Sequence, residues 1–228
     1  MLEESKSEGE TKFIRAANAL AVYDPDNPKW NQFSLVLAEK IVQENPLFLK
    51  TWKDAFFAIR NILIPQLVNI FNEIGEGNES KRLLAANLLA DYASNRPDII
   101  AELMLNSGSN FFYVFLPFAK VHKQACLSIF EREFFKEIYV DQSTQLREKN
   151  AARQANAAVA MVLLGEAQKI WPLFRHTVTP TVRSFLIHRF SSFGINPSLV
   201  VSQLKEEKDV SARRGLLLTL GEYDEEIL

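Results

Sequence analysis

Apolar side chains recur along this chain at a spacing that places them on one face of an α-helix. Two clear runs are Leu35, Ala38, Ile41 and Val42, and Leu67, Ile70, Phe71 and Ile74. The steps of three and four residues within each run match the 3.6-residue helical turn, not the alternation of a strand. Because no segment gives a clear strand pattern, we predict an all-α fold of about twelve helices.

Glycine and proline contents agree with this prediction. The 228 residues include 8 Gly and 9 Pro, so tight turns are few. Because proline has no main-chain N–H, helices tolerate it best in their first turn. We therefore expect helices to begin at or near five prolines, which are Pro46, Pro65, Pro97, Pro117 and Pro172.

A repeat with a period of 30 residues runs through the C-terminal third. Arg153, Arg183 and Arg213 are spaced 30 residues apart, and each follows Ala or Val. Each arginine opens an apolar segment that reads as a helix, and the preceding helix also repeats, with Ile170 matching Val200. This Asp/Thr-x-x-Val/Ala-Arg pattern is typical of short HEAT-like repeats, which are pairs of helices.

The same repeat carries signals for helix ends. Gly165, Gly194 and Gly221 end the three apolar segments, and we expect them to cap the helices at their C-termini. Thr179 and Asp209 stand four residues before their arginines, and we expect them to be N-caps.

A second repeat has an offset of 69 residues, close to two HEAT-like units. Asn18, Asn87 and Asn156 each follow an alanine and stand at this offset. Side-chain amides inside helices usually bond to main-chain groups of the adjoining turn. We therefore assign the three asparagines a structural role, as we do the repeat arginines at 153, 183 and 213, which in HEAT-like repeats bond to an acid or carbonyl of the neighbouring repeat.

We divide the chain into three segments. Residues 1–10 are polar and acidic and are predicted to be flexible or disordered, residues 11–139 to form irregular helical repeats, and residues 146–228 to form regular HEAT-like repeats. The polar segment 140–145 is the best candidate for a linker or long loop. Because stacked repeats bury their cores against neighbours, we expect one continuous right-handed α-α superhelix, a HEAT/armadillo-like solenoid.

The charge balance narrows the classes of partner. The formal net charge is −2, from 26 Lys and Arg against 28 Asp and Glu, which argues against nucleic acid as the main ligand. The polar start is not a secretory signal, and no apolar run approaches the ~18 residues that span a bilayer. We therefore expect a cytoplasmic protein without membrane segments.

The sequence offers no catalytic constellation. It lacks phosphate-binding glycine loops and a GxSxG motif, and none of its three histidines has another His or Cys at helical spacing. We predict no catalytic residue, no cofactor and no metal site. Cys126 is expected to be a buried apolar residue, and Asp91 to pair with an arginine or cap the next turn.

Two groups of residues are candidates for binding a partner. Arg175, Arg183 and Arg189 belong to the richest basic stretch, residues 147–189, and would suit an acidic partner or phosphates. Phe111 and Phe112 open a run of five aromatic rings in eight residues. Such rings form either a core or an exposed interface anchor, and for the arginines a solvated helix face is the alternative.

Several runs carry a family resemblance, among them Asn87-Leu-Leu-Ala-Asp-Tyr92, Arg153-Gln-Ala-Asn-Ala-Ala-Val159, Ile170-Trp-Pro-Leu-Phe-Arg-His176 and Asp209-Val-Ser-Ala-Arg-Arg214. Over nearly its whole length the chain resembles the helical repeat region of long bacterial multidomain proteins. Those proteins join a serine/threonine protein kinase domain, or a formylglycine-generating-sulfatase-like domain, to helical repeats. The resemblance implies a non-catalytic fragment of a larger signalling-type protein. No catalytic motif of either domain is present, so no catalytic residue is carried over.

We therefore expect a non-catalytic HEAT-like repeat scaffold that mediates protein–protein or interdomain interaction. One alternative is a purely architectural spacer. Another is a HEAT-like nucleic-acid-binding protein or DNA glycosylase, which would need a catalytic acid near clustered aromatic rings over a basic groove, whereas Trp30, Trp52 and Trp171 are scattered. The C-terminal repeat, which we expect to stop after one helix of a pair, leaves self-association through that end open.

Overall fold

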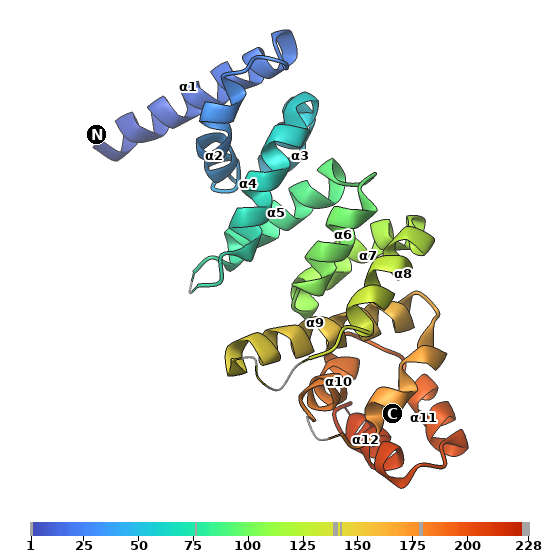
Figure 1. Cartoon of the computed structure of the whole chain (residues 1–228). Coiled ribbons are helices and arrows are strands. Elements are labelled where there is room, and N and C mark those ends of the chain that lie inside the picture. Colours follow the sequence, from blue (N-terminus) through green and yellow to red (C-terminus); the bar gives the residue numbers. More distant parts are fainter. Residues whose placement is uncertain (1, 76, 139–140, 142, 178–179, 225–228) are drawn as a thin grey trace. The chain divides into compact units, whose positions relative to one another are not determined.

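The computed structural model describes residues 2–75, 77–138, 141, 143–177 and 180–224. These residues form twelve α-helices and four short 3-10 helices and contain no strand (Figure 1). The prediction of an all-α fold is therefore confirmed.

The helices form two compact units, of which the first ends at Arg96 and the second begins at Pro97. The helices of the first unit are α1 (Leu2–Tyr23), α2 (Trp30–Ile41), η1 (Pro46–Phe48), α3 (Leu49–Ala55), η2 (Phe57–Ile59), α4 (Arg60–Asn72) and α5 (Glu79–Tyr92). Within this unit α2 packs against α1 and α4, and α4 packs against α5. Helix α3 packs against α1 and against the short helices η1 and η2 that flank it.

The second unit holds α6 (Pro97–Leu105), α7 (Ser109–Val121), α8 (Lys123–Phe134), α9 (Thr144–Leu163), η3 (Ala167–Lys169), η4 (Trp171–Phe174), α10 (Thr181–Ser192), α11 (Pro197–Glu206) and α12 (Val210–Leu220). Helix α9 packs against α6 and α8 on the N-terminal side of the unit and against α10 on the other, and α10 packs against α12.

The division between the two compact units does not coincide with the predicted change from irregular to regular repeats. Segment 140–145 leads into α9, which begins at Thr144, and α9 packs against helices from both sides of that segment. Segment 140–145 therefore lies inside the second unit, and the two units divide at residue 96 instead. The first residues also differ from expectation, because helix α1 extends through the segment 2–10 that we predicted to be flexible.

Local signals for helix ends were read correctly at several positions. Gly165 and Gly194 adopt positive φ, at 88° and 58°, and in each case the next residue donates its N–H to a carbonyl in the last helical turn. This is the Schellman arrangement, which glycine adopts without a Cβ penalty. Asp209 is the N-cap of α12, and its carboxylate accepts the Ala212 N–H at 2.8 Å. Thr179, the other predicted N-cap, lies outside the described residues.

Other local predictions were wrong. Pro65 and Pro117 lie inside α4 and α7 instead of near helix starts. Residues 170–174, predicted to match the helix at 200–204, form no α-helix: η3 ends at Lys169, and η4 covers Trp171–Phe174. Pro172 stands in the first turn of η4, where its missing N–H costs no helical hydrogen bond. Gly221 is the C-cap of α12, as predicted, but it has an ordinary helical φ of −67° and not the positive φ of Gly165 and Gly194.

Aromatic rings fill the core of the second unit. The rings of Trp171, Phe174 and Phe190 form a cluster in which the closest two centroids, those of Phe174 and Phe190, are 5.4 Å apart. Phe112 meets Phe193 edge to face at 5.1 Å. The first set of contacts joins η4 to α10, and the second joins α7 to the turn that follows α10.

Candidate functional site

A side chain from another helix closes the C-terminal end of α6. Asn156, which is buried in α9, donates its amide hydrogens to the main-chain carbonyls of Leu105 at 2.9 Å and Ser107 at 2.8 Å, with Met104 at 3.3 Å. The last four carbonyls of a helix have no partner within it, so a donor from a neighbour satisfies them. We call such a contact an end clamp.

End clamps recur in both units. Gln154, also in α9, donates to the carbonyls of Phe134 and Lys136 at the end of α8, at 2.8 and 2.6 Å. In the first unit Arg82 of α5 donates its Nε–H to the Phe71 carbonyl at 2.8 Å, at the end of α4. Neighbouring helices are therefore joined by specific hydrogen bonds as well as by apolar packing.

Arg153 connects α9 to acids on α6 and α8. Its guanidinium bonds to Glu102 at 2.7 Å and to Glu133 at 3.0 Å, and a further bond reaches the Asn106 side-chain oxygen at 2.8 Å. Burial opposes the charge of Arg153, but the two carboxylates outweigh it and raise the arginine pKa. Burial likewise opposes ionisation of Glu102, but hydrogen bonding to Arg153 and its charge lower the carboxyl pKa. Both shifts favour the ion pair.

The repeat arginines contact different partners. Arg153 binds carboxylates, whereas Arg183 donates to the Ser211 carbonyl at 2.9 Å and packs against Gly215. Arg213 donates to the carbonyls that end α11, those of Leu204 and Glu207, at 2.9 and 3.1 Å. Sequence spacing therefore identified positions with a structural role but not a shared contact.

The repeat asparagines also differ from one another. Asn156 is an end clamp, whereas Asn87 donates to the Leu83 carbonyl of its own helix at 2.8 Å. Asn18 lies half-buried in α1. The three fall in α1, α5 and α9, so the offset of 69 residues corresponds to four α-helices.

Phe111 and Phe112 are not exposed anchors. Their side chains are 4% and 0% exposed, and Phe112 packs against Phe193 in the core. The helical spacing of α7 turns both rings, together with Phe115, toward the interior. Of the same run, Tyr113 is partly exposed, but its hydroxyl donates to the Phe193 carbonyl.

Two of the three candidate arginines are also structural. Arg189 donates to the Ala152 carbonyl and lies over the Phe185 ring, and burial lowers its pKa to about 10. Arg183 makes the contact with α12 described above. Arg175 is exposed, and of the three it alone is placed to meet a partner.

Reactive groups in the described residues have structural surroundings. Cys126 is fully buried, as predicted, and burial raises its thiol pKa to about 11. Asp91 pairs with Lys53 at 2.8 Å, where we had expected it to pair with an arginine or to cap the next turn. Among the described residues no group of three His, Cys, Asp or Glu side chains could hold a metal ion.

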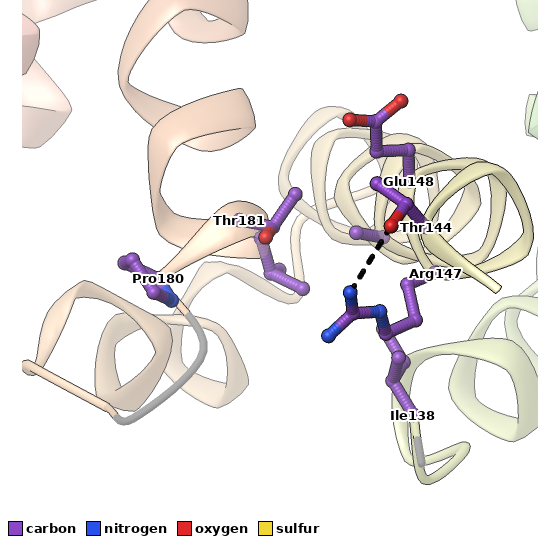
Figure 2. A pocket seen from close by; sticks show the side chains of 8 residues that line it. Ile138, Thr144, Arg147, Glu148, Pro180 and Thr181 are labelled. Carbon is purple, nitrogen blue, oxygen red and sulfur yellow. Dashed lines mark hydrogen bonds between the residues drawn. The ribbon is translucent and has the colours of Figure 1, made fainter. Parts of the chain in front are cut away.

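The sequence did not predict the hollows of the surface, which include a cavity and an apolar groove. A cavity of about 250 Å³ lies between the first turns of α9 and α10, with the Arg147 guanidinium beside it (Figure 2). An apolar groove of about 180 Å³ lies between α1 and α2, and its lining includes Leu20, Trp30 and Phe33. The run Phe13, Ala16, Ala17 and Leu20 has helical spacing, so the stripe was readable in the sequence. Its exposure was not, because exposure depends on which helices pack nearby.

No single helix among the described residues is long and apolar enough to cross a membrane. One pair, residues 46–55 with 57–72, has the required length and composition together but is bent by 66°.

Comparisons with known proteins gave no match to a family model, a curated protein or a solved structure.

Proposed function

We propose that this chain is a non-catalytic HEAT-like repeat scaffold that mediates protein–protein or interdomain interaction in a larger signalling-type protein. In this proposal its helix pairs form a right-handed α-α superhelix. The stacking of α2 between α1 and α4, and of α9 between α8 and α10, supports a repeat arrangement. The resemblance to repeat regions of bacterial multidomain proteins supports the proposal that the chain is part of a larger signalling-type protein.

The observation that carries the proposal is the set of hydrogen bonds made by the buried polar side chains. Among the described residues these are Ser34, Ser107, Gln154, Asn156 and Thr219. All five donate hydrogen bonds to main-chain carbonyls. Ser34, Ser107 and Thr219 bond to a carbonyl three or four residues earlier in the chain, whereas Gln154 and Asn156 bond to carbonyls 20 and 49 residues earlier and so join neighbouring helices. Catalytic sites need polar groups poised toward a substrate, and these donors are directed at main-chain carbonyls instead. Function is therefore assigned to the surface.

The apolar groove between α1 and α2 is the surface that we assign to a protein partner. Leu20 and Phe33 are 36% and 43% exposed at its rim, and Trp30 is buried at its base. Its size and apolar lining fit one anchoring side chain, such as Leu or Phe, from a partner. A pure spacer does not require such a groove.

The test is affinity purification from a lysate of the source organism with matched baits. The baits are the wild-type chain, a Leu20→Glu/Phe33→Glu variant, and Ile74→Glu, which adds charge at a side chain that is 87% exposed outside the groove. We expect the wild type and Ile74→Glu to retain the same proteins and the double variant to lose them, with all three folded by circular dichroism. Retention by the double variant would reject the groove, and absence of specific proteins from every bait would favour the spacer.

A further inference from the structure

The cavity between α9 and α10 has an unusual polar wall. Figure 2 shows Arg147 reaching from α9 into the space that faces Pro180 and Thr181 at the start of α10. Its Nη2 donates to the Thr144 hydroxyl at 3.3 Å. Its Nε is buried and has no hydrogen-bond partner. Figure 2 shows the two terminal nitrogens of the guanidinium, not the buried Nε, on the side of the cavity, and their N–H groups are the donors that a ligand oxygen could reach.

Other donors lie on the opposite wall. Thr181 and Val182 line the cavity and belong to the first turn of α10, where main-chain N–H groups have no partner within the helix. Among the described residues Pro180 occupies the N-cap position, and its side chain makes no capping hydrogen bond. The positive end of the helix dipole therefore adds to the charge of Arg147. An anion in the cavity would be approached by donors from two helices.

One acid also lines the cavity. Figure 2 shows the Glu148 carboxylate pointing away from the Arg147 guanidinium, and no ion pair joins the two side chains. The guanidinium is therefore not neutralised by its sequence neighbour. The rest of the wall is apolar and includes Ile138 and Val182.

From this arrangement we propose that the cavity binds a phosphate monoester. Guanidinium, hydroxyl and helix N–H donors on different sides suit a tetrahedral group with several acceptor oxygens better than a planar carboxylate. The apolar wall suits the organic part of an ester, which inorganic phosphate lacks. The ester is carried either by a small metabolite or by a phosphorylated side chain of a protein, and the two share this chemistry. The inference does not depend on the scaffold function proposed above.

The experiment is a titration of the whole chain, followed by calorimetry, with four probes. These are O-phosphoserine, a phosphoserine-containing peptide, phenyl phosphate and unphosphorylated serine. We expect the phosphate esters to bind and serine not to bind. Tighter binding of the peptide than of phenyl phosphate would indicate a protein source, and the reverse order would indicate a metabolite.

Matched variants place the binding in the cavity. Arg147→Gln removes the guanidinium, and Arg214→Gln makes the same charge change at an exposed arginine of α12 that does not line the cavity. We expect affinity to fall at least about tenfold in Arg147→Gln and to stay within about twofold in Arg214→Gln. Thr144→Val, which removes one hydroxyl from the wall, gives a second readout should Arg147→Gln unfold. Absence of saturable binding to the wild type, or an equal loss in Arg214→Gln, would overturn the proposal.

Discussion

The helices within the second unit are joined by different interactions from those within the first. In the second unit, α9 presents Arg153, Gln154 and Asn156 within four residues, and each bonds to groups on α6 or α8. In the first unit, the end clamp at Arg82 and the bond from Tyr92 to the Lys53 carbonyl accompany mainly apolar packing. Several large apolar side chains there remain exposed, among them Leu47 at 85% and Phe48 at 53%.

This difference separates two ways of stacking helices. Hydrogen bonds to a helix end fix the register of one helix against another, whereas apolar packing tolerates sliding and leaves surface for a partner. We therefore expect the free energy of unfolding of the second unit to depend strongly on a few polar residues. The first unit should tolerate polar substitution and carry most of the adaptable apolar surface.

The largest expected effect comes from Asn156. Asn156→Leu leaves carbonyls at the end of α6 without their donor in a buried place, so we expect unfolding of the second unit to require about 3 kcal/mol less free energy. Trp171 lies in this unit, and Trp30 and Trp52 lie in the first. Urea titrations of variants that keep only Trp171, or only the other two, report the units separately.

The control is the equivalent residue of the first unit. Asn87→Leu removes a bond within its own helix, and we expect a change below about 1 kcal/mol. If Asn156→Leu and Asn87→Leu lowered the free energy of unfolding equally, the proposed difference between the units would be wrong.

The next effect concerns the turn after α10. Gly194 has φ of 58°, and a Cβ there would lie 2.8 Å from the Tyr113 hydroxyl oxygen. We expect Gly194→Ala to destabilise the second unit by about 1–3 kcal/mol. Thermal unfolding beside Gly221→Ala checks this, because Gly221 has an ordinary helical φ and an added Cβ would make only van der Waals contact there. A change in Gly221→Ala as large as in Gly194→Ala would contradict the account.

The smallest effect depends on pH. Hydrogen bonding to Arg153 and its charge overcome burial and lower the folded-state pKa of Glu102, so the ion pair contributes stability above the ordinary carboxyl pKa of about 4.3. That contribution is lost as pH falls through the lowered folded-state value. Because Glu102 is partly exposed, we expect no more than about 1 kcal/mol.

Urea unfolding between neutral pH and the acid limit of folding measures this contribution. The wild type should lose more stability than Arg153→Met over the acid range, and added salt should narrow the gap. Parallel pH curves for the two proteins would show that Glu102 contributes nothing through Arg153.

Sequence and structure agree where the controlling interaction is local. Gly165 and Gly194 cap helices because their backbone conformation depends on adjacent residues, and Asp209 caps a turn three residues away. The all-α fold follows in the same way from helical spacing of apolar residues.

Prediction failed where the partner lies far along the chain. The acceptors of Asn156 precede it by 49 to 52 residues, so its spacing from Asn87 could not reveal that only one of them is an end clamp. The burial of Phe111 and Phe112 likewise depends on how α7 packs against α6 and α8. The cavity beside Arg147 forms only when the starts of α9 and α10 meet, 37 residues apart by number (Thr144 and Thr181).

The end clamps of α9 also impose an order on folding while the chain is being synthesised. Gln154 and Asn156 bond to carbonyls that precede them by 18 to 52 residues. A ribosome makes α6 and α8 first, so their C-terminal carbonyls remain bonded to water until α9 has left the exit tunnel. The first unit is complete by then. The nascent chain therefore carries a finished N-terminal unit ahead of helices that wait for a later one to join them.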